Sequence, residues 1–162
     1  MDMIEIGIAE MAVTNSSTVL VTKSLGSCLG IILYDPDSKI GGLVHVMHPD
    51  SSLAKSKRTN NPAKFADSAV KAMLKKMIDS GAQKDVIVAK LAGGAKMFSS
   101  VSNNGVMNIG FRIVDAARTA LEKEGIRIVA EDVGKDYGRA IEFDTRSGRV
   151  KIKSVGRPVK TI

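Results

Sequence analysis

The chain has 162 residues, which is enough to bury the core of a single domain without disulfides or bound metal. Its hydrophobic fraction of 44% and charged fraction of 25% are those of an ordinary globular protein, and no run approaches the roughly 18 apolar residues of a membrane span. One cysteine excludes an internal disulfide, and the acidic N-terminal segment MDMIEIGIAEM does not resemble a signal peptide. We therefore expect one domain over residues 1–162, located in the cytoplasm and without membrane insertion.

The charge is basic and unevenly distributed. Lys and Arg number 24 against 17 Asp and Glu, which gives a formal net charge of +7. Residues 51–78 contain a single acid, Asp67, among many lysines, and residues 146–162 contain no acid at all. Such a surface attracts an acidic protein or a nucleic acid, unless it is simply a solvated face. Because only 4% of the residues are aromatic, few side chains can stack on the bases of a single strand, and we expect no nucleic-acid partner.

The first half of the chain predicts β-hairpins. Short runs rich in Val, Ile and Leu, each bounded by Asn, Ser, Asp, Pro or Gly, predict strands over residues 4–13, 17–25, 28–35 and 39–47. Between the last two, residues 34–38 read Tyr-Asp-Pro-Asp-Ser and predict a turn, because proline fixes φ while Asp and Ser bond the local backbone. The resulting hairpin would place Cys28 and His45 on neighbouring strands.

The second half of the chain adds a first helix after a polar loop over residues 49–60. The helix begins at Asn61-Pro62, since asparagine caps helices and proline suits the first turn, and Gly81 ends it. The apolar residues that recur at helical spacing are Phe65, Ala66, Ala69, Val70, Met73, Leu74, Met77 and Ile78.

The remaining elements complete a mixed fold. Residues 85–91 predict a buried strand except at Lys90, residues 108–124 a second helix, and residues 126–133 a further strand. Residues 139–155 predict a hairpin that turns at 145–148. About nine strands, mostly in antiparallel hairpins, with two helices on one face indicate an α/β domain of two stacked sheets and a helical layer.

Cys28 lies between two glycines in the segment TKSLGSCLG. A lone cysteine is most often a small buried hydrophobic residue. The alternative is a nucleophile, because small residues let the backbone approach a substrate carbonyl, and the N–H groups at Gly26 and Ser27 would stabilise an oxyanion.

A nucleophilic cysteine needs a base, and His45 is the candidate; its alternative role is that of a structural histidine in the sheet. His48 is three residues further on, so on a strand it points to the opposite face, which also disfavours a metal ion shared by Cys28, His45 and His48. Thr22 can accept a hydrogen bond from the imidazole, although it can equally be an ordinary strand threonine. The pair Gly93-Gly94 lacks the spacing of a phosphate-binding loop, and we assign it no role and expect no cofactor.

The segment TKSLGSCLGIILYDPDSKIGGLVHVMHP closely resembles the signature region of the CheD family, the chemoreceptor glutamine deamidases. The segments KLAGGAKMF, NIGFR, EDVGKDYGRAIEFD and TRSGRVKIK also match, so the resemblance extends over roughly residues 4–155.

The resemblance implies a three-layer α/β/β sandwich with a triad of Cys28 as nucleophile, His45 as general base and Thr22 as the residue that orients the histidine. It implies hydrolysis of glutamine side chains on chemoreceptor cytoplasmic helices to glutamate, with release of ammonia. It also implies a CheC-type phosphatase as a partner. A non-catalytic protein that docks on such a phosphatase is the alternative function.

Overall fold

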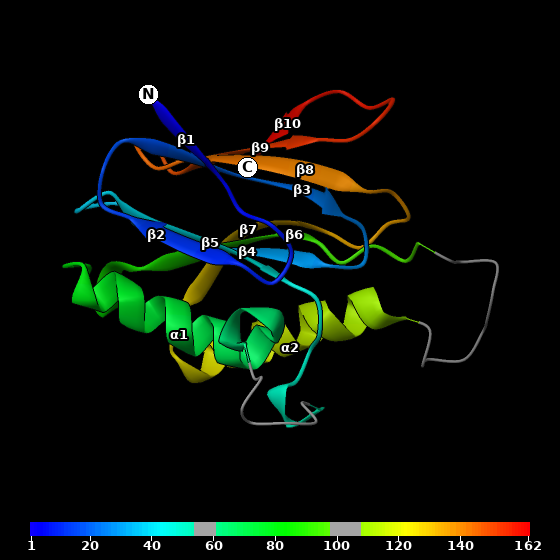
Figure 1. Cartoon of the computed structure of the whole chain (residues 1–162), viewed down its shortest axis with the longest axis horizontal. Helices are drawn as coiled ribbons and strands as arrows, with labels where there is room; N and C mark the ends of the chain where they lie inside the picture. Colours follow the sequence, from blue (N-terminus) through cyan, green and yellow to red (C-terminus); the bar gives the residue numbers. More distant parts are fainter. Residues whose placement is uncertain (54–60, 98–107) are drawn as a thin grey trace.

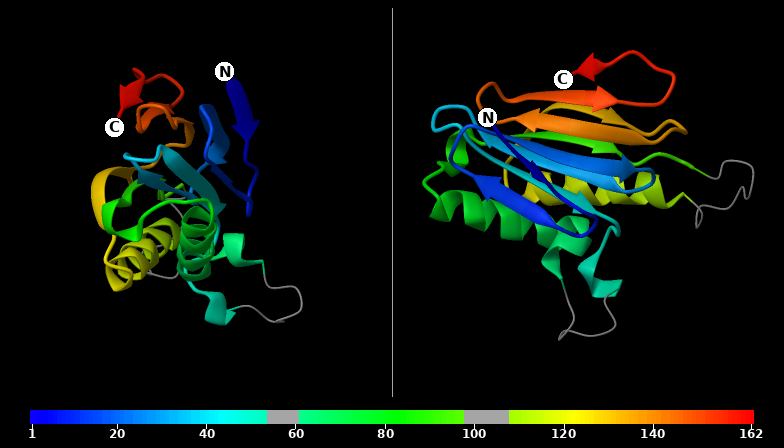
Figure 2. Two further views of the ribbon diagram at one scale, coloured as in Figure 1. Left: turned by 90° about the vertical axis from the view of Figure 1, so that its left-hand side faces the viewer. Right: turned by 45° about the horizontal axis from the view of Figure 1, so that its top comes forward.

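The structure is a computed structural model that describes residues 1–53, 61–97 and 108–162. In this part of the chain, two five-stranded sheets stack face to face, and two α-helices cover the free face of one of them (Figures 1 and 2). The three-layer α/β/β arrangement expected from the sequence is therefore confirmed. None of the described helices is long and apolar enough to cross a membrane.

The two sheets draw their strands from both halves of the chain. The outer sheet has the spatial order β1 (Asp2–Glu5), β3 (Thr18–Leu25), β8 (Arg139–Asp144), β9 (Arg149–Lys153) and β10 (Lys160–Thr161). The central sheet has the order β2 (Met11–Thr14), β5 (Ile40–Val46), β4 (Leu29–Asp35), β6 (Val88–Gly93) and β7 (Arg127–Val133). All neighbours are antiparallel except β1 with β3 and β6 with β7.

Two strand predictions differ from the structure. Residues 85–91 form a strand only from Val88 onward, because Lys84–Val86 form a 3-10 turn. Residues 4–13 do not form a single strand but cross from the outer sheet to the central sheet between β1 and β2. The crossing includes Ala9 in the left-handed region, with φ at 61°, which no strand accommodates. The short β10 was also not predicted, because a strand of two residues is too short to show an alternation of apolar and polar side chains.

The helices α1 (Ala66–Asp79) and α2 (Ile109–Lys123) lie on the central sheet. A short 3-10 turn, Pro62–Lys64, precedes α1, and the Asn61 side chain caps this turn by accepting from the N–H of Ala63. Two further 3-10 turns cover Ser51–Leu53 and Lys84–Val86. The predicted apolar face of α1 is buried except for Ile78, which is exposed, so that face is narrower than expected.

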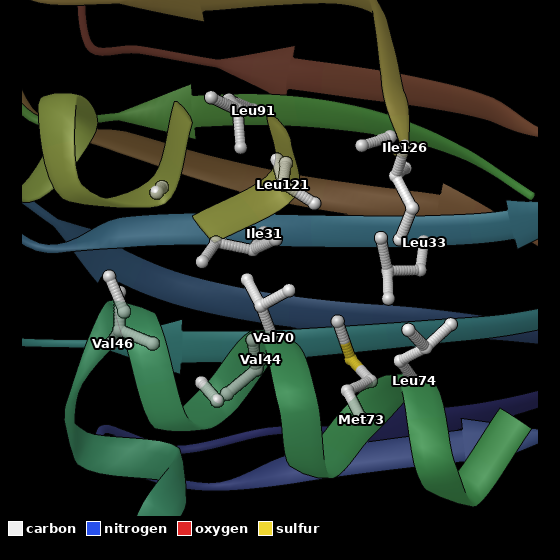
Figure 3. Packing of buried hydrophobic residues seen from close by; sticks show 14 of the residues in the cluster. Ile31, Leu33, Val44, Val46, Val70, Met73, Leu74, Leu91, Leu121 and Ile126 are labelled. Carbon is white, nitrogen blue, oxygen red and sulfur yellow. The ribbon is translucent and has the colours of Figure 1, made fainter. Parts of the chain in front are cut away.

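The core is divided into two layers by the central sheet. Between this sheet and the helices, side chains such as Ile31, Val44, Val70 and Leu121 interlock (Figure 3). Between the two sheets lies a second cluster that consists of Ile6, Leu20, Leu25, Ile32, Tyr34, Leu43, Ala92, Ile141, Phe143, Val150 and Ile152. Because side chains alternate along a strand, every second residue of β4 and β5 points into this space between the sheets.

Candidate active site

Cys28 lies in the turn that joins β3 of the outer sheet to β4 of the central sheet. We call residues 24–28 the cysteine turn. It begins with an irregularity in β3, where the register with β8 shifts between Thr22 and Leu25. Ser24 there adopts a φ of 59°, and its carbonyl accepts a hydrogen bond from the N–H of Gly26 at 3.1 Å. The chain is thus bent away from the outer sheet just before the thiol.

A second segment of backbone holds the cysteine turn. The N–H of Gly94 donates to the carbonyl of Cys28 at 2.8 Å, and the N–H of Ala95 donates to the carbonyl of Gly26 at 2.9 Å. A Cβ at Gly93 would lie 2.5 Å from the Cys28 carbonyl oxygen, so only glycine permits this approach. The glycine pair to which the sequence analysis gave no role therefore supports the turn that carries the cysteine. Its signal was the close spacing of two glycines at the end of a strand.

His45 lies in β5 directly opposite Gly30 of β4. Cys28 is two residues before Gly30, and side chains repeat every second residue, so Cys28 and His45 belong to the same face of the central sheet. Both face the space between the sheets: Cys28 is half-buried against the inter-sheet cluster, and His45 is fully buried. The predicted hairpin does bring the two residues to one face.

The Thr22 hydroxyl is hydrogen-bonded to the imidazole of His45. Its Oγ1 donates to the carbonyl of Ile6 at 2.6 Å and lies 2.8 Å from Nδ1 of His45. A hydroxyl has one proton, and here Ile6 accepts it, so Oγ1 can only accept from the imidazole. Nδ1 therefore carries the ring proton, and Nε2 is the basic nitrogen. Nε2 is buried and has no hydrogen-bond partner among the described residues.

The crossing between β1 and β2 holds the histidine from the other side. The N–H of Ala9 donates to the carbonyl of His45 at 2.9 Å, and the N–H of His45 donates to the carbonyl of Glu10 at 3.1 Å. The same crossing supplies the Ile6 carbonyl that receives the Thr22 proton. Sequence reasoning missed this contribution because it comes from backbone atoms, which leave no signature in residue type.

Burial shifts both titrating groups toward their neutral forms. Burial raises the pKa of the Cys28 thiol, an effect that the hydrogen bond from its own backbone N–H partly opposes. Burial also lowers the pKa of His45. In the free protein both shifts thus favour a neutral thiol and a neutral imidazole over an ion pair.

His48 lies apart from this arrangement. Its ring packs against Phe65 just before α1, with 5.7 Å between the ring centroids. Burial and the positive charge of Lys64 both lower the pKa of His48. Within the described residues, no group of three or more His, Cys, Asp or Glu side chains could hold a metal ion.

A family match and several sequence relatives point to one family. The family described as CheD chemotactic sensory transduction matches residues 47–154. A "Probable chemoreceptor glutamine deamidase CheD" from Caldanaerobacter subterraneus subsp. tengcongensis is 47% identical, and the alignment covers 98% of this chain and 97% of that protein. A relative of the same name from Lachnoclostridium phytofermentans is 45% identical, with 99% of each chain covered. The "Chemoreceptor glutamine deamidase CheD" of Halalkalibacterium halodurans is 43% identical, again over 99% of both chains.

Proposed function

The chain belongs to the CheD family of chemoreceptor glutamine deamidases, and on this premise we propose that Cys28, His45 and Thr22 carry out its reaction. The reaction is the hydrolysis of glutamine side chains in chemoreceptors to glutamate, with release of ammonia, during adaptation in chemotaxis. The observation that supports these roles most directly is the hydrogen bond between Thr22 and Nδ1 of His45, at 2.8 Å. Because Thr22 accepts from Nδ1, Nε2 is left as the base. His45 also lies on the same face of the central sheet as Cys28, the only cysteine in the sequence.

The first half of the reaction forms a thioester. Nε2 of His45 takes the proton from the Cys28 thiol while Sγ bonds to the side-chain carbonyl carbon of the glutamine. The carbonyl oxygen becomes an oxyanion. The imidazolium then gives its proton to the amide nitrogen, the C–N bond breaks, and ammonia leaves. Because burial favours the neutral thiol and imidazole in the free protein, this proton transfer accompanies attack instead of preceding it.

Backbone N–H groups of the cysteine turn stabilise the oxyanion. In the free protein the N–H of Gly26 donates to Ser24 and that of Cys28 to its own thiol, so the donor we assign first is the N–H of Ser27, joined by that of Cys28 once the sulfur has bonded to the substrate. Gly26 supports them by its small size, because a Cβ there would lie 3.3 Å from Cγ of Met97.

The second half of the reaction returns the cysteine to its starting state. His45 removes a proton from water, and the hydroxyl oxygen attacks the thioester carbon. The C–S bond then breaks, glutamate is released, and the thiolate recovers its proton from the imidazolium. Thr22 keeps Nδ1 protonated in both halves, so the same nitrogen, Nε2, acts each time.

Partners and location follow from the substrate. The reaction requires the chemoreceptor cytoplasmic helices, so we place the protein in the cytoplasm. The net charge of +7 suits an acidic receptor surface.

The family resemblance also supports a CheC-type phosphatase as a partner, and size-exclusion chromatography of the chain with the phosphatase of its own organism tests that interaction. A purely docking role is less well supported, because it has no use for the Thr22–His45 hydrogen bond.

The deciding experiment compares the wild type with Cys28→Ser on a cytoplasmic chemoreceptor fragment from the same organism. We measure ammonia release and follow the conversion of glutamine to glutamate by mass spectrometry. We expect Cys28→Ser to lose activity by at least about 1,000-fold with its fold intact, because a hydroxyl is a much poorer nucleophile at neutral pH. Near-full turnover by the variant would rule out the thioester mechanism. A well-folded wild type with no turnover would favour the docking role.

A further inference from the structure

Arg139 is a buried cation close to the cysteine turn. It begins strand β8, directly opposite Leu25 at the end of β3, and it is only 3% exposed. Arginine is almost never buried unless its charge has partners. The contacts of this side chain therefore indicate what its burial achieves.

The guanidinium bonds one carboxylate and two backbone carbonyls. Its Nε donates to the Asp132 carboxylate at 3.2 Å, and its Nη1 donates to the carbonyls of Gly134 at 3.0 Å and Gly93 at 3.4 Å. The ring of Tyr137 covers the group, with its centroid 4.7 Å from Cζ. The side chain thus joins β7, the connection from β7 to β8, and the end of β6.

The end of β6 is the segment that holds the cysteine turn. Gly93, whose carbonyl accepts from Arg139, is followed by Gly94 and Ala95, whose N–H groups donate to the carbonyls of Cys28 and Gly26. The Gly93 carbonyl also accepts from the N–H of Gly134 at 3.0 Å. A continuous path of hydrogen bonds therefore runs from the guanidinium to the backbone of the nucleophile.

A gain in stability alone does not explain this buried charge. Taking an ion pair out of water costs about as much free energy as the pair returns, and apolar side chains of the same volume often do as well. Nη2 of Arg139 adds to the cost, because it is buried and has no partner among the described residues. What an arginine offers here is its planar fork, which can donate in several fixed directions at once.

We propose that Arg139 is a positioning residue. By holding the backbone of residues 93–95 in place, it fixes the position and orientation of Cys28 relative to His45. This inference rests on the proposed function. The residue does not touch the substrate. It acts through the backbone of residues 93–95 on the carbonyls of Cys28 and Gly26.

The test is Arg139→Lys, which keeps the charge but carries all its donors on one nitrogen and so lacks the planar fork that donates from Nε and Nη1. We expect kcat for deamidation to fall by about 10–100-fold while KM stays within about twofold, because small displacements of a reacting group slow chemistry more than binding. We also expect the N–H groups of Gly94 and Ala95 to exchange with deuterium at least about tenfold faster, as followed by NMR.

The matched control is Asp35→Asn, which removes another buried charge at the far end of β4. This variant should lose stability, yet keep its kcat and the slow exchange at Gly94 and Ala95. If Arg139→Lys does not fold, Asp132→Asn takes its place, since it weakens the bond to Nε and leaves Arg139 itself intact. An unchanged kcat together with unchanged exchange at Gly94 and Ala95 would overturn the proposal, as would an equal loss of kcat in Asp35→Asn.

Failure of the proposed function can be distinguished from failure of the positioning role of Arg139. If the wild type shows no turnover that depends on Cys28, the deamidase mechanism fails. The exchange rates at Gly94 and Ala95 still decide whether Arg139 holds the cysteine turn, because they are measured without substrate.

Discussion

Strand β4 ends in a turn on either side, and the two turns are held in different ways. At its far end, the Asp35 carboxylate accepts from the N–H groups of Asp37 and Ser38 within the turn and from the N–H of Gln83. At its near end, no carboxylate among the residues that the structure describes accepts from the backbone of the cysteine turn in this way. Its carbonyls depend on Gly94 and Ala95, which are far away in the sequence.

The two ends also differ in whether they favour the charged or the neutral form of their ionisable side chains. Burial alone would raise the pKa of Asp35, but the hydrogen bonds from Gln83, Ser38 and Asp37 outweigh it and hold this pKa below its usual value. At the other end, burial raises the pKa of Cys28 and lowers that of His45, so both shifts favour the neutral forms. The far end therefore favours a charged side chain, and the near end favours uncharged forms of Cys28 and His45.

The largest loss of activity is expected when the base beside the cysteine turn is removed. We expect His45→Gln to reduce deamidation by at least about 1,000-fold, because no other described group is placed to take the thiol proton. His48→Gln is the matched control and should keep activity within about twofold, since His48 packs against Phe65 on a separate part of the molecule. Steady-state kinetics on both variants check this. An equal loss in the two would mean that the wrong histidine has been assigned.

A smaller loss should follow when the base is kept but its orientation is not. Thr22→Val preserves the shape of the side chain and removes the acceptor for Nδ1, so we expect kcat to fall by about 10–100-fold. Thr22→Ser keeps the hydroxyl and should recover most of that loss. Comparable kcat values for the valine and serine variants would show that the hydrogen bond to His45 has no part in catalysis.

The two turns also differ in how far the sequence alone could predict them. The turn after β4 was predicted from Pro36 and its Asp and Ser neighbours, because its hydrogen bonds lie almost entirely within a few residues. The cysteine–histidine pairing could be predicted for the same reason, since one hairpin fixes it. The support from Gly93-Gly94, Arg139 and the Ile6 carbonyl could not, because it depends on how distant segments stack in two sheets.

The pH dependence of the cysteine distinguishes a neutral pair from an ion pair. Because burial raises the pKa of Cys28, we expect its alkylation by iodoacetamide to rise with pH to a midpoint above the ordinary thiol value of about 8.5. At neutral pH the rate should be at least about tenfold below its plateau. The acid limb of kcat/KM should lie below the ordinary histidine value of about 6.5, since burial lowers the pKa of His45. An alkylation midpoint near or below neutral pH would instead indicate a thiolate–imidazolium pair.

The smallest effect on turnover is expected at the far end. Asp35→Asn should lower the free energy of unfolding by about 1–3 kcal/mol at neutral pH, because an amide cannot accept at both of its terminal atoms. The pKa of Asp35 is lower in the folded than in the unfolded state, so its stabilisation is complete above about pH 4 and is lost as the pH falls through the folded value. Urea unfolding of the wild type and the variant should therefore converge in acid.

Turnover per folded molecule should not change in Asp35→Asn. Strand β4 has seven residues, so its two ends lie six residue steps, roughly 20 Å, apart. The contacts that hold Cys28 and His45 do not include Asp35. A fall in kcat that follows the loss of stability would show that the ends of the strand are mechanically coupled. The reactive pair would then depend on the whole of β4 and not only on the backbone that surrounds it.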